Sequence, residues 1–126
     1  MSAARIPREA GSVLAILGAS AVALGAFGAH ALRGSLSPLQ MEIWRTAVQY
    51  HFWHTLAFAL ATMICARAAA WFFAVGVLLF SGSLYALALG APDWAGAITP
   101  FGGVCFILGW IALGVAVIRR AGFDTD

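Results

Sequence analysis

Charged residues are scarce in this sequence. Only 10% of its 126 residues are Asp, Glu, Lys or Arg, whereas an ordinary soluble domain carries about 25%. Hydrophobic residues instead make up 63% of the chain, and its mean hydropathy is +0.93. This composition excludes a typical soluble domain and predicts an integral membrane protein of one domain, residues 1–126, with the lipid bilayer as its main surroundings.

Lysine is absent altogether, so the seven basic residues are all arginines, and the formal net charge is only +2. The arginines are scattered along the chain, and no basic run is interleaved with aromatic residues. Nucleic-acid-binding domains concentrate positive charge on one face. We therefore expect no nucleic acid partner.

Four apolar stretches predict an all-α integral membrane four-helix bundle. Each stretch has roughly the 20 residues that an α-helix needs to cross a hydrocarbon core. The expected spans cover residues 11–32, 46–66, 68–90 and 98–118. The first span follows Arg5 and Arg8 and ends in Ala29-His30-Ala31, a pattern that mimics a signal peptide. Its apolar run exceeds the usual h-region of about 7–15 residues, so we expect a retained span.

Two local patterns position the second span. Ser37 is followed by Pro38 and Gln40, which fits an N-cap, a proline at the first helical position and a capping-box partner. A helix therefore begins near Pro38, ahead of the membrane. At its other end only Arg67 and neighbouring alanines separate the second and third spans, so these two helices are expected to be antiparallel neighbours.

The arginines predict the orientation. Four spans place both termini on one side together with the connection at Arg67, and cytoplasmic loops carry an excess of Lys and Arg. The terminal side holds Arg5, Arg8, Arg67, Arg119 and Arg120, and the other side holds Arg33 and Arg45. Both termini are therefore predicted to be cytoplasmic.

The polar residues of the spans gather in the outer half of the membrane in this orientation. The expected cluster comprises His30, Gln49, Tyr50, His51, His54, Ser81, Ser83, Tyr85 and Thr99. One interpretation is interhelical hydrogen bonding, worth on the order of 0.6 kcal/mol per bond. The other is an outward-facing pocket that binds a ligand or takes up a proton, because ionisable groups inside membranes are functional candidates.

Metal binding is a further alternative. His51 and His54 are one helical turn apart, and His30 is able to approach them from the first span. Three histidines suit zinc or copper, and His30 with His51 would suit a bis-histidine haem. No carboxylate is clearly placed beside them, however, so we expect neither a metal nor another cofactor.

Glycines are expected to serve helix packing, because small residues let helix backbones approach closely in membranes. In the first span Gly11, Ala15, Gly18, Gly25 and Ala29 are expected to form one stripe. The packing glycines assigned across the chain are Gly18, Gly25, Gly28, Gly102, Gly103 and Gly109.

Several motifs together resemble those of a known family. They are GAFGAHAL at residues 25–32, AVQYHFWH at 47–54, SGSLY at 81–85, GAITPFGG at 96–103 and LGW at 108–110. The chain thereby resembles the small four-helix membrane proteins described as domain of unknown function 423, and the resemblance covers nearly the whole chain. The family pattern corresponds to His30, Gln49, Tyr50, His54, Ser81, Ser83, Tyr85, Thr99 and Pro100. It implies a bacterial inner membrane or mitochondrial setting, and it implies no activity.

The sequence therefore predicts a non-enzymatic membrane protein, an accessory or stabilising subunit of a larger membrane assembly. The expected contact is with a membrane-protein partner or with further copies of the chain. Small size and stripes of small residues motivate this prediction. Two alternatives remain open: a small transporter or channel with an outer polar pocket, and a histidine-based metal or haem protein.

Overall fold

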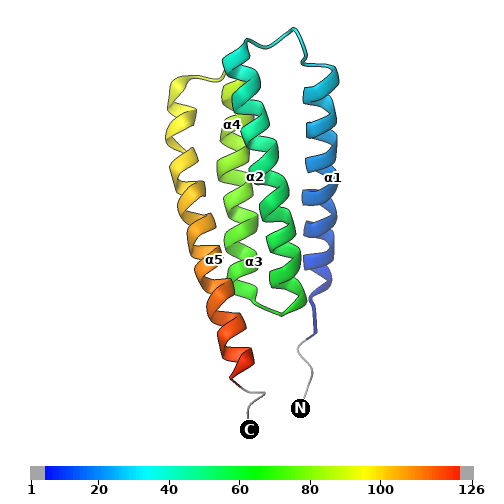
Figure 1. Ribbon diagram of the computed structural model, residues 1–126, viewed down its shortest axis with the longest axis vertical. Coiled ribbons are helices and arrows are strands. Elements are labelled where there is room, and N and C mark those ends of the chain that lie inside the picture. Colours follow the sequence, from blue (N-terminus) through cyan, green and yellow to red (C-terminus); the bar gives the residue numbers. More distant parts are fainter. Residues whose placement is uncertain (1–4, 123–126) are drawn as a thin grey trace.

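Four long helices make up the fold of this computed structural model, which describes residues 5–122 (Figure 1). Helix α1 spans Arg8–His30 and α2 spans Pro38–Met63. The third long helix is continuous through α3 (Arg67–Gly76), the π-helical turn η1 (Val77–Ser81) and α4 (Gly82–Ala88). A short 3₁₀ helix η2 (Asp93–Ala97) then leads into α5 (Thr99–Ala121). The all-helical prediction is confirmed.

Helix α2 begins where the sequence predicts. The backbone N–H of Gln40 donates to the Ser37 Oγ at 3.2 Å, and the Ser37 N–H donates to the Gln40 Oε1 at 2.9 Å. This capping box satisfies two backbone donors that a helix start leaves without intrahelical partners. Pro38 occupies the first turn, where its missing N–H costs no hydrogen bond. The N-terminus of α2 is thereby fixed at the end of the loop that follows α1.

The helices form an open row rather than the closed bundle that the sequence suggests. Helix α1 packs chiefly on α2, whereas α5 packs chiefly on α3 and η1, and Figure 1 shows α1 and α5 on opposite sides of the molecule. The main core joins α2, α3, η1 and α5. Its buried members are Ala57, Phe58, Ala61, Ala69, Phe73, Val77, Phe106 and Leu113. Helix α1 contributes only partly buried side chains to this core, which is why it stays peripheral.

Three helical segments are long and apolar enough to cross a membrane. They are Arg8–His30, Arg67–Ala88 and Asp93–Ala121, and they correspond to the predicted spans 11–32, 68–90 and 98–118. The predicted span 46–66 lies in α2, which has 26 residues but is more polar in its first half. A fourth crossing by α2 therefore stays a prediction.

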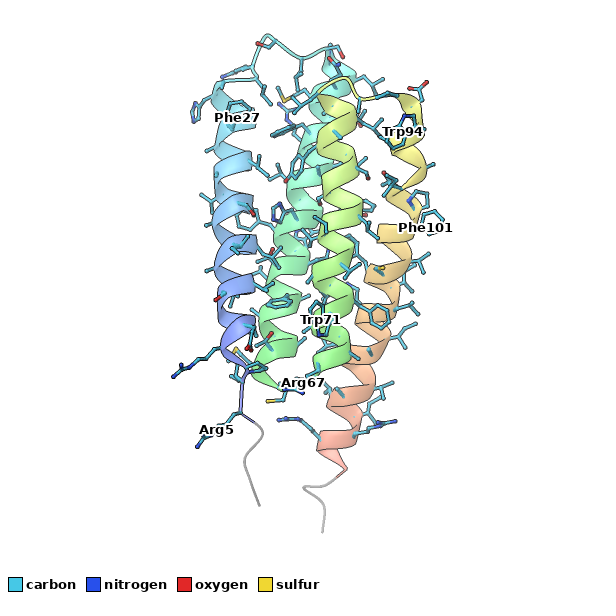
Figure 2. The ribbon with its side chains drawn as sticks, turned by 180° about the vertical axis from the view of Figure 1, so that it is seen from behind. Arg5, Phe27, Arg67, Trp71, Trp94 and Phe101 are labelled. Carbon is cyan, nitrogen blue, oxygen red and sulfur yellow. The ribbon has the colours of Figure 1, made fainter. Side chains whose placement is uncertain are left out.

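The two ends of the molecule along the helix axes differ in their side chains. Helix α1 begins and α5 ends at the same end of the molecule, where the α2–α3 connection also lies (Figure 1). Figure 2 shows Arg5 and Arg67 at this end, whereas Phe27 and Trp94 lie at the opposite one. Exposed aromatic rings are typical of membrane–water interfaces, and both Phe27 and Trp94 are exposed.

Candidate functional site

His51 connects three helices at the centre of the candidate site. Its ring is buried in α2. The Nε2 atom lies 3.3 Å from the Ser20 Oγ on α1, and the Nδ1 atom lies 2.9 Å from the Tyr85 hydroxyl on α4. Both ring nitrogens are therefore engaged, one on each side of α2.

The positions of the hydrogens in the hydrogen bonds between Ser20, His51 and Tyr85 can be assigned from the chemistry of these side chains. Ser20 has one hydroxyl hydrogen, which it donates to the Leu17 carbonyl oxygen at 3.1 Å. Ser20 therefore accepts from His51, whose Nε2 carries the hydrogen. The neutral ring then accepts at Nδ1 from the Tyr85 hydroxyl. In a catalytic serine–histidine pair the serine donates its hydrogen to the histidine, so this pair has the reverse arrangement.

His54 lies one turn further along α2 and has the opposite tautomer. Its Nδ1 is 2.7 Å from the Tyr50 carbonyl oxygen, which can only accept, so Nδ1 carries the hydrogen. The Trp110 indole N–H on α5 can only donate, and it meets the His54 Nε2 at 3.2 Å. His54 is therefore neutral in this geometry, and neither of its nitrogens is available to a further ligand.

Aromatic rings surround the His54 ring. The imidazole stacks on Phe106, with ring centroids 3.5 Å apart and an interplanar angle of 9°. Tyr50 stacks on Phe80 with centroids 4.5 Å apart, and Phe73 packs edge-on against Trp110 at 5.2 Å. These contacts join α2, the third helix and α5 into one layer of rings, and each pair contributes roughly 0.5–1.5 kcal/mol beyond its buried area.

Ser81 and Ser83 link the third helix to α2 and α5 through hydrogen bonds. The Ser81 hydroxyl donates to the Ala47 carbonyl oxygen of α2 at 2.7 Å. Ser83 donates to the Phe80 carbonyl oxygen at 3.0 Å, and its Oγ lies 2.6 Å from the Thr99 Oγ1 at the start of α5. Because Ser83 has no second hydrogen, Thr99 is the donor between them. These polar atoms therefore act as links between helices.

A π-helical turn positions Ser81 and the start of α5. The turn η1 covers Val77–Ser81, and π-helical turns often occur at functional sites. Gly102 of α5 lies directly against this turn, and a Cβ atom at Gly102 would overlap the backbone of Phe80. The close approach of α5 thus depends on a glycine that faces an irregular stretch of backbone.

Two of the predicted site residues lie apart from the cluster. His30 is the last residue of α1 and is exposed, about 15 Å along the helix from Ser20 at a rise of 1.5 Å per residue. Gln49 is exposed on α2, because it is rotated by about 200° from His51 at 100° per residue. Among the other predicted residues the structure links three pairs directly, which are His51 with Tyr85, His54 with Tyr50 and Ser83 with Thr99. Ser81 instead bonds the backbone of α2 at Ala47.

Sequence reasoning missed Ser20 and Trp110 as partners of the two histidines. One signal for Ser20 was its polar side chain within an apolar span, and Trp110 lies in one of the family-like motifs. Within residues 5–122, no group of three His, Cys, Asp or Glu side chains is placed to hold a metal ion.

The glycines divide into tight and ordinary contacts. A Cβ at Gly28 would overlap the Trp44 indole, and one at Gly109 would lie 2.7 Å from the Phe73 ring. At Gly18, Gly25 and Gly103 the nearest side-chain atoms would be 4.0, 3.3 and 3.9 Å away.

The expected single stripe on α1 is divided between two faces. Gly18 and Gly25 face α2, whereas Gly11 and Ala15 are exposed. Ala15 is rotated by about 60° from Gly18 at 100° per residue. Gly11, seven residues before Gly18, points nearly the same way as Gly18, but no neighbouring atom lies within 4 Å of a Cβ added there.

Several proteins are similar to this chain in sequence. Residues 24–103 match the family model described as "Protein of unknown function (DUF423)". The "UPF0382 membrane protein YwdK" of Bacillus subtilis is 41% identical over 117 residues, which are 86% of this chain and 93% of that protein.

Two further relatives have similar coverage. A Staphylococcus epidermidis protein, "UPF0382 membrane protein SERP0230", is 45% identical over 87% of this chain and 98% of its own length. The "UPF0382 inner membrane protein YgdD" of Escherichia coli K12 is 43% identical over 83% of this chain and 86% of its own. No solved structure matches the chain.

Proposed function

Because the chain belongs to the DUF423 family of membrane proteins, we propose that it is an accessory subunit that packs through α1 against a helix of another membrane protein. The chain is a multi-pass inner membrane protein, in keeping with the E. coli relative and with its apolar helices. The proposal concerns what this small scaffold does within the bilayer.

The observation that carries this proposal is the outward face of α1. Ala15, Ala19 and Ala23 recur at intervals of four and are all exposed. Small residues at this spacing let a second helix approach closely in a membrane, where van der Waals contact and lipid entropy drive association. Helix α2 covers the opposite face of α1, so the alanine face has no partner within residues 5–122.

The polar cluster supports a structural role inside the subunit. The nitrogens of His51 and His54 are bound to groups of the same chain, and the hydroxyls of Ser81 and Ser83 are engaged as well. A transporter would need polar groups left available along a path across the membrane. From His54 towards the α2–α3 connection the core instead continues as Phe58, Ala61 and Leu113.

The proposed orientation places four helices across the membrane with both termini in the cytoplasm. Helix α2 is about 39 Å long at 1.5 Å per residue and lies against both α1 and the third helix, so it would cross the same layer. Arg5 and Arg67 share one end of the molecule (Figure 2), which is the arginine-rich end of the chain. The positive-inside rule assigns that end to the cytoplasm.

Photo-crosslinking in native membranes tests the proposal. A photoreactive amino acid at Ala19 is expected to capture one discrete membrane protein, which mass spectrometry then identifies. The matched control places the same probe at Ile107, which is 61% exposed on α5, where we expect lipid adducts. Helix α1 carries the specific contact if only the Ala19 probe captures protein.

Larger side chains on the alanine face of α1 provide a second test of the proposed contact. The double variant Ala15→Ile/Ala19→Ile keeps α1 apolar but prevents close approach, so it is expected to abolish the crosslink formed by a probe at Ala23. Capture of a further copy of this chain alone would replace the accessory role with a homo-oligomer. Absence of any protein adduct at Ala19 and Ala23 would rule out the proposed contact.

A further inference from the structure

A groove lies between the end of α1 and the beginning of α2, at the end of the molecule opposite the chain termini. Its volume is about 430 Å³, within the roughly 300–1,000 Å³ typical of small-molecule sites. The residues that line it are Gly25, Gly28, Ala29, Arg33, Met41, Trp44, Arg45, Val48 and Gln49. The groove is separate from the histidine cluster, because His51 and His54 do not line it.

Two arginines give this groove its charge. Arg33 comes from the α1–α2 loop and Arg45 from α2, and both are exposed. Neither forms an ion pair with any residue in the described part of the chain, including Glu42 one turn before Arg45. No acidic residue lines the groove. Two unpaired guanidinium groups therefore face one opening, which is suited to an anion with several oxygen acceptors.

The floor of the groove is apolar. The Trp44 indole N–H donates to the Leu24 carbonyl oxygen at 3.1 Å, so its polar atom is already satisfied and the ring forms part of the wall. Gly25 and Gly28 have no side chains to fill the space above α1, and Met41 and Val48 complete the wall on α2. A charged opening above an apolar floor matches an amphiphile.

The position of the groove identifies the kind of amphiphile. The exposed Trp94 ring lies at the same end of the molecule as the groove (Figure 2), and exposed tryptophans are typical of the level of the lipid headgroups. The lining extends from Arg33 in the loop to Gly25, which lies about 8 Å below the end of α1 at His30 at a rise of 1.5 Å per residue. The charged end of the groove therefore lies among headgroups and its apolar end among acyl chains.

We propose that this groove binds one anionic phospholipid, with its phosphate between Arg33 and Arg45 and an acyl chain along the floor formed by Trp44, Val48 and Gly25. Basic pockets between membrane helices bind anionic headgroups in this way. The inference is independent of the accessory role, because the lipid occupies the α1–α2 groove and not the alanine face of α1.

Native mass spectrometry of the full-length chain tests the proposal. The purified protein is given equal amounts of phosphatidylglycerol and phosphatidylcholine with identical acyl chains, and one phosphatidylglycerol is expected to stay bound. The double variant Arg33→Gln/Arg45→Gln should bind it at least tenfold more weakly, since it removes both charge-assisted contacts to the phosphate and a loss of about 1.4 kcal/mol already corresponds to a factor of ten. The matched control Arg119→Gln/Arg120→Gln removes two arginines from the other end and should bind as the unmodified chain does.

A second variant distinguishes lipid binding in the groove from lipid binding to a charged surface. Ala29→Leu keeps both arginines but fills part of the floor, so it should also weaken phosphatidylglycerol binding several-fold, with helix content checked by circular dichroism. Equal binding of both lipids, or full binding by either groove variant, would overturn the proposal. Competition by inorganic phosphate as effective as that by phosphatidylglycerol would make this a small-anion site and overturn the lipid assignment.

Discussion

The His54 imidazole lies nearly parallel to the Phe106 ring, with centroids 3.5 Å apart and planes 9° from parallel. The contact joins α2 to α5, two helices whose backbones have few other direct contacts. The stacked ring also receives the Trp110 indole N–H at Nε2. A polar ring is thus accommodated among aromatic side chains because both of its nitrogens are satisfied.

The hydrogen bond between His54 and Trp110 can be measured by a double-mutant cycle. His54→Phe keeps a stacked ring on Phe106 but removes the acceptor, and Trp110→Phe removes the donor. We expect a coupling of about 0.6 kcal/mol and at most roughly 1.7 kcal/mol, the range found between membrane helices. The measurement is the free energy of unfolding in mixed micelles of SDS and a mild detergent.

The control for this cycle pairs His54→Phe with Trp71→Phe. Trp71 is 70% exposed on α3 (Figure 2) and has no contact with His54 among the described residues. Its coupling to His54 should be zero within error. A coupling as large as that of Trp110 would show that the cycle reports a general loss of aromatic surface and not this hydrogen bond.

Gly102→Ala should destabilise the protein more than the small size of the change suggests. The added Cβ would meet the backbone of Phe80 in η1, and a backbone cannot rotate away as a flexible side chain does. Overpacking of this kind costs about 1–3 kcal/mol. The measurement is the same free energy of unfolding, expected to fall by this amount.

Gly114 provides the matched control on the same helix. A Cβ at Gly114 would have no neighbour within 4 Å, so Gly114→Ala should be neutral or should stabilise the protein by up to about 1 kcal/mol through helix propensity. Equal effects of the two substitutions would mean that α5 shifts freely against η1, contrary to the packing described above.

Depth along the membrane was predictable from the sequence, because every helical residue advances by the same 1.5 Å. Counting residues along the helices predicted that Ser81, Ser83 and Thr99 lie near the level of the histidines. The structure links Ser83 to Thr99 directly. The direction in which each side chain points was harder to predict. Gln49 and His51 lie at similar depth but on nearly opposite faces of α2, and polar and apolar residues are mixed around this helix, so no apolar periodicity marks its buried face.

The pairing of residues between α1 and α2 explains why His30 lies far from His51, contrary to the expectation that His30 belongs to the same polar cluster. The two helices are antiparallel, so each step back along α1 is matched by a step forward along α2. The observed pairs are Gly28 with Trp44, Gly25 with Val48, Ser20 with His51 and Gly18 with Thr55. His30 therefore lies near the start of α2 and far from His51. The length of the loop fixes this register, and Ser20 could have been found by counting from it.

The last prediction concerns two threonines on α2 with opposite surroundings. The Thr62 Oγ1 is buried and has no hydrogen-bond partner within residues 5–122, whereas the Thr55 hydroxyl donates to the His51 carbonyl oxygen at 2.7 Å. Valine has the same shape as threonine but no hydroxyl. Thr62→Val should raise the free energy of unfolding by about 1 kcal/mol, because an unsatisfied buried hydroxyl carries a cost of roughly that size.

Thr55→Val is the matched control and should lower the free energy of unfolding by about 0.5–1 kcal/mol, the net value of an ordinary hydrogen bond. The signs of the two changes should therefore differ although the chemical change is the same. A loss of stability in Thr62→Val would mean that its hydroxyl has a partner in the membrane, either a bound water or a group on a neighbouring protein. In that case Thr62 would mark a second contact of α2, towards the end of the molecule that holds the α2–α3 connection.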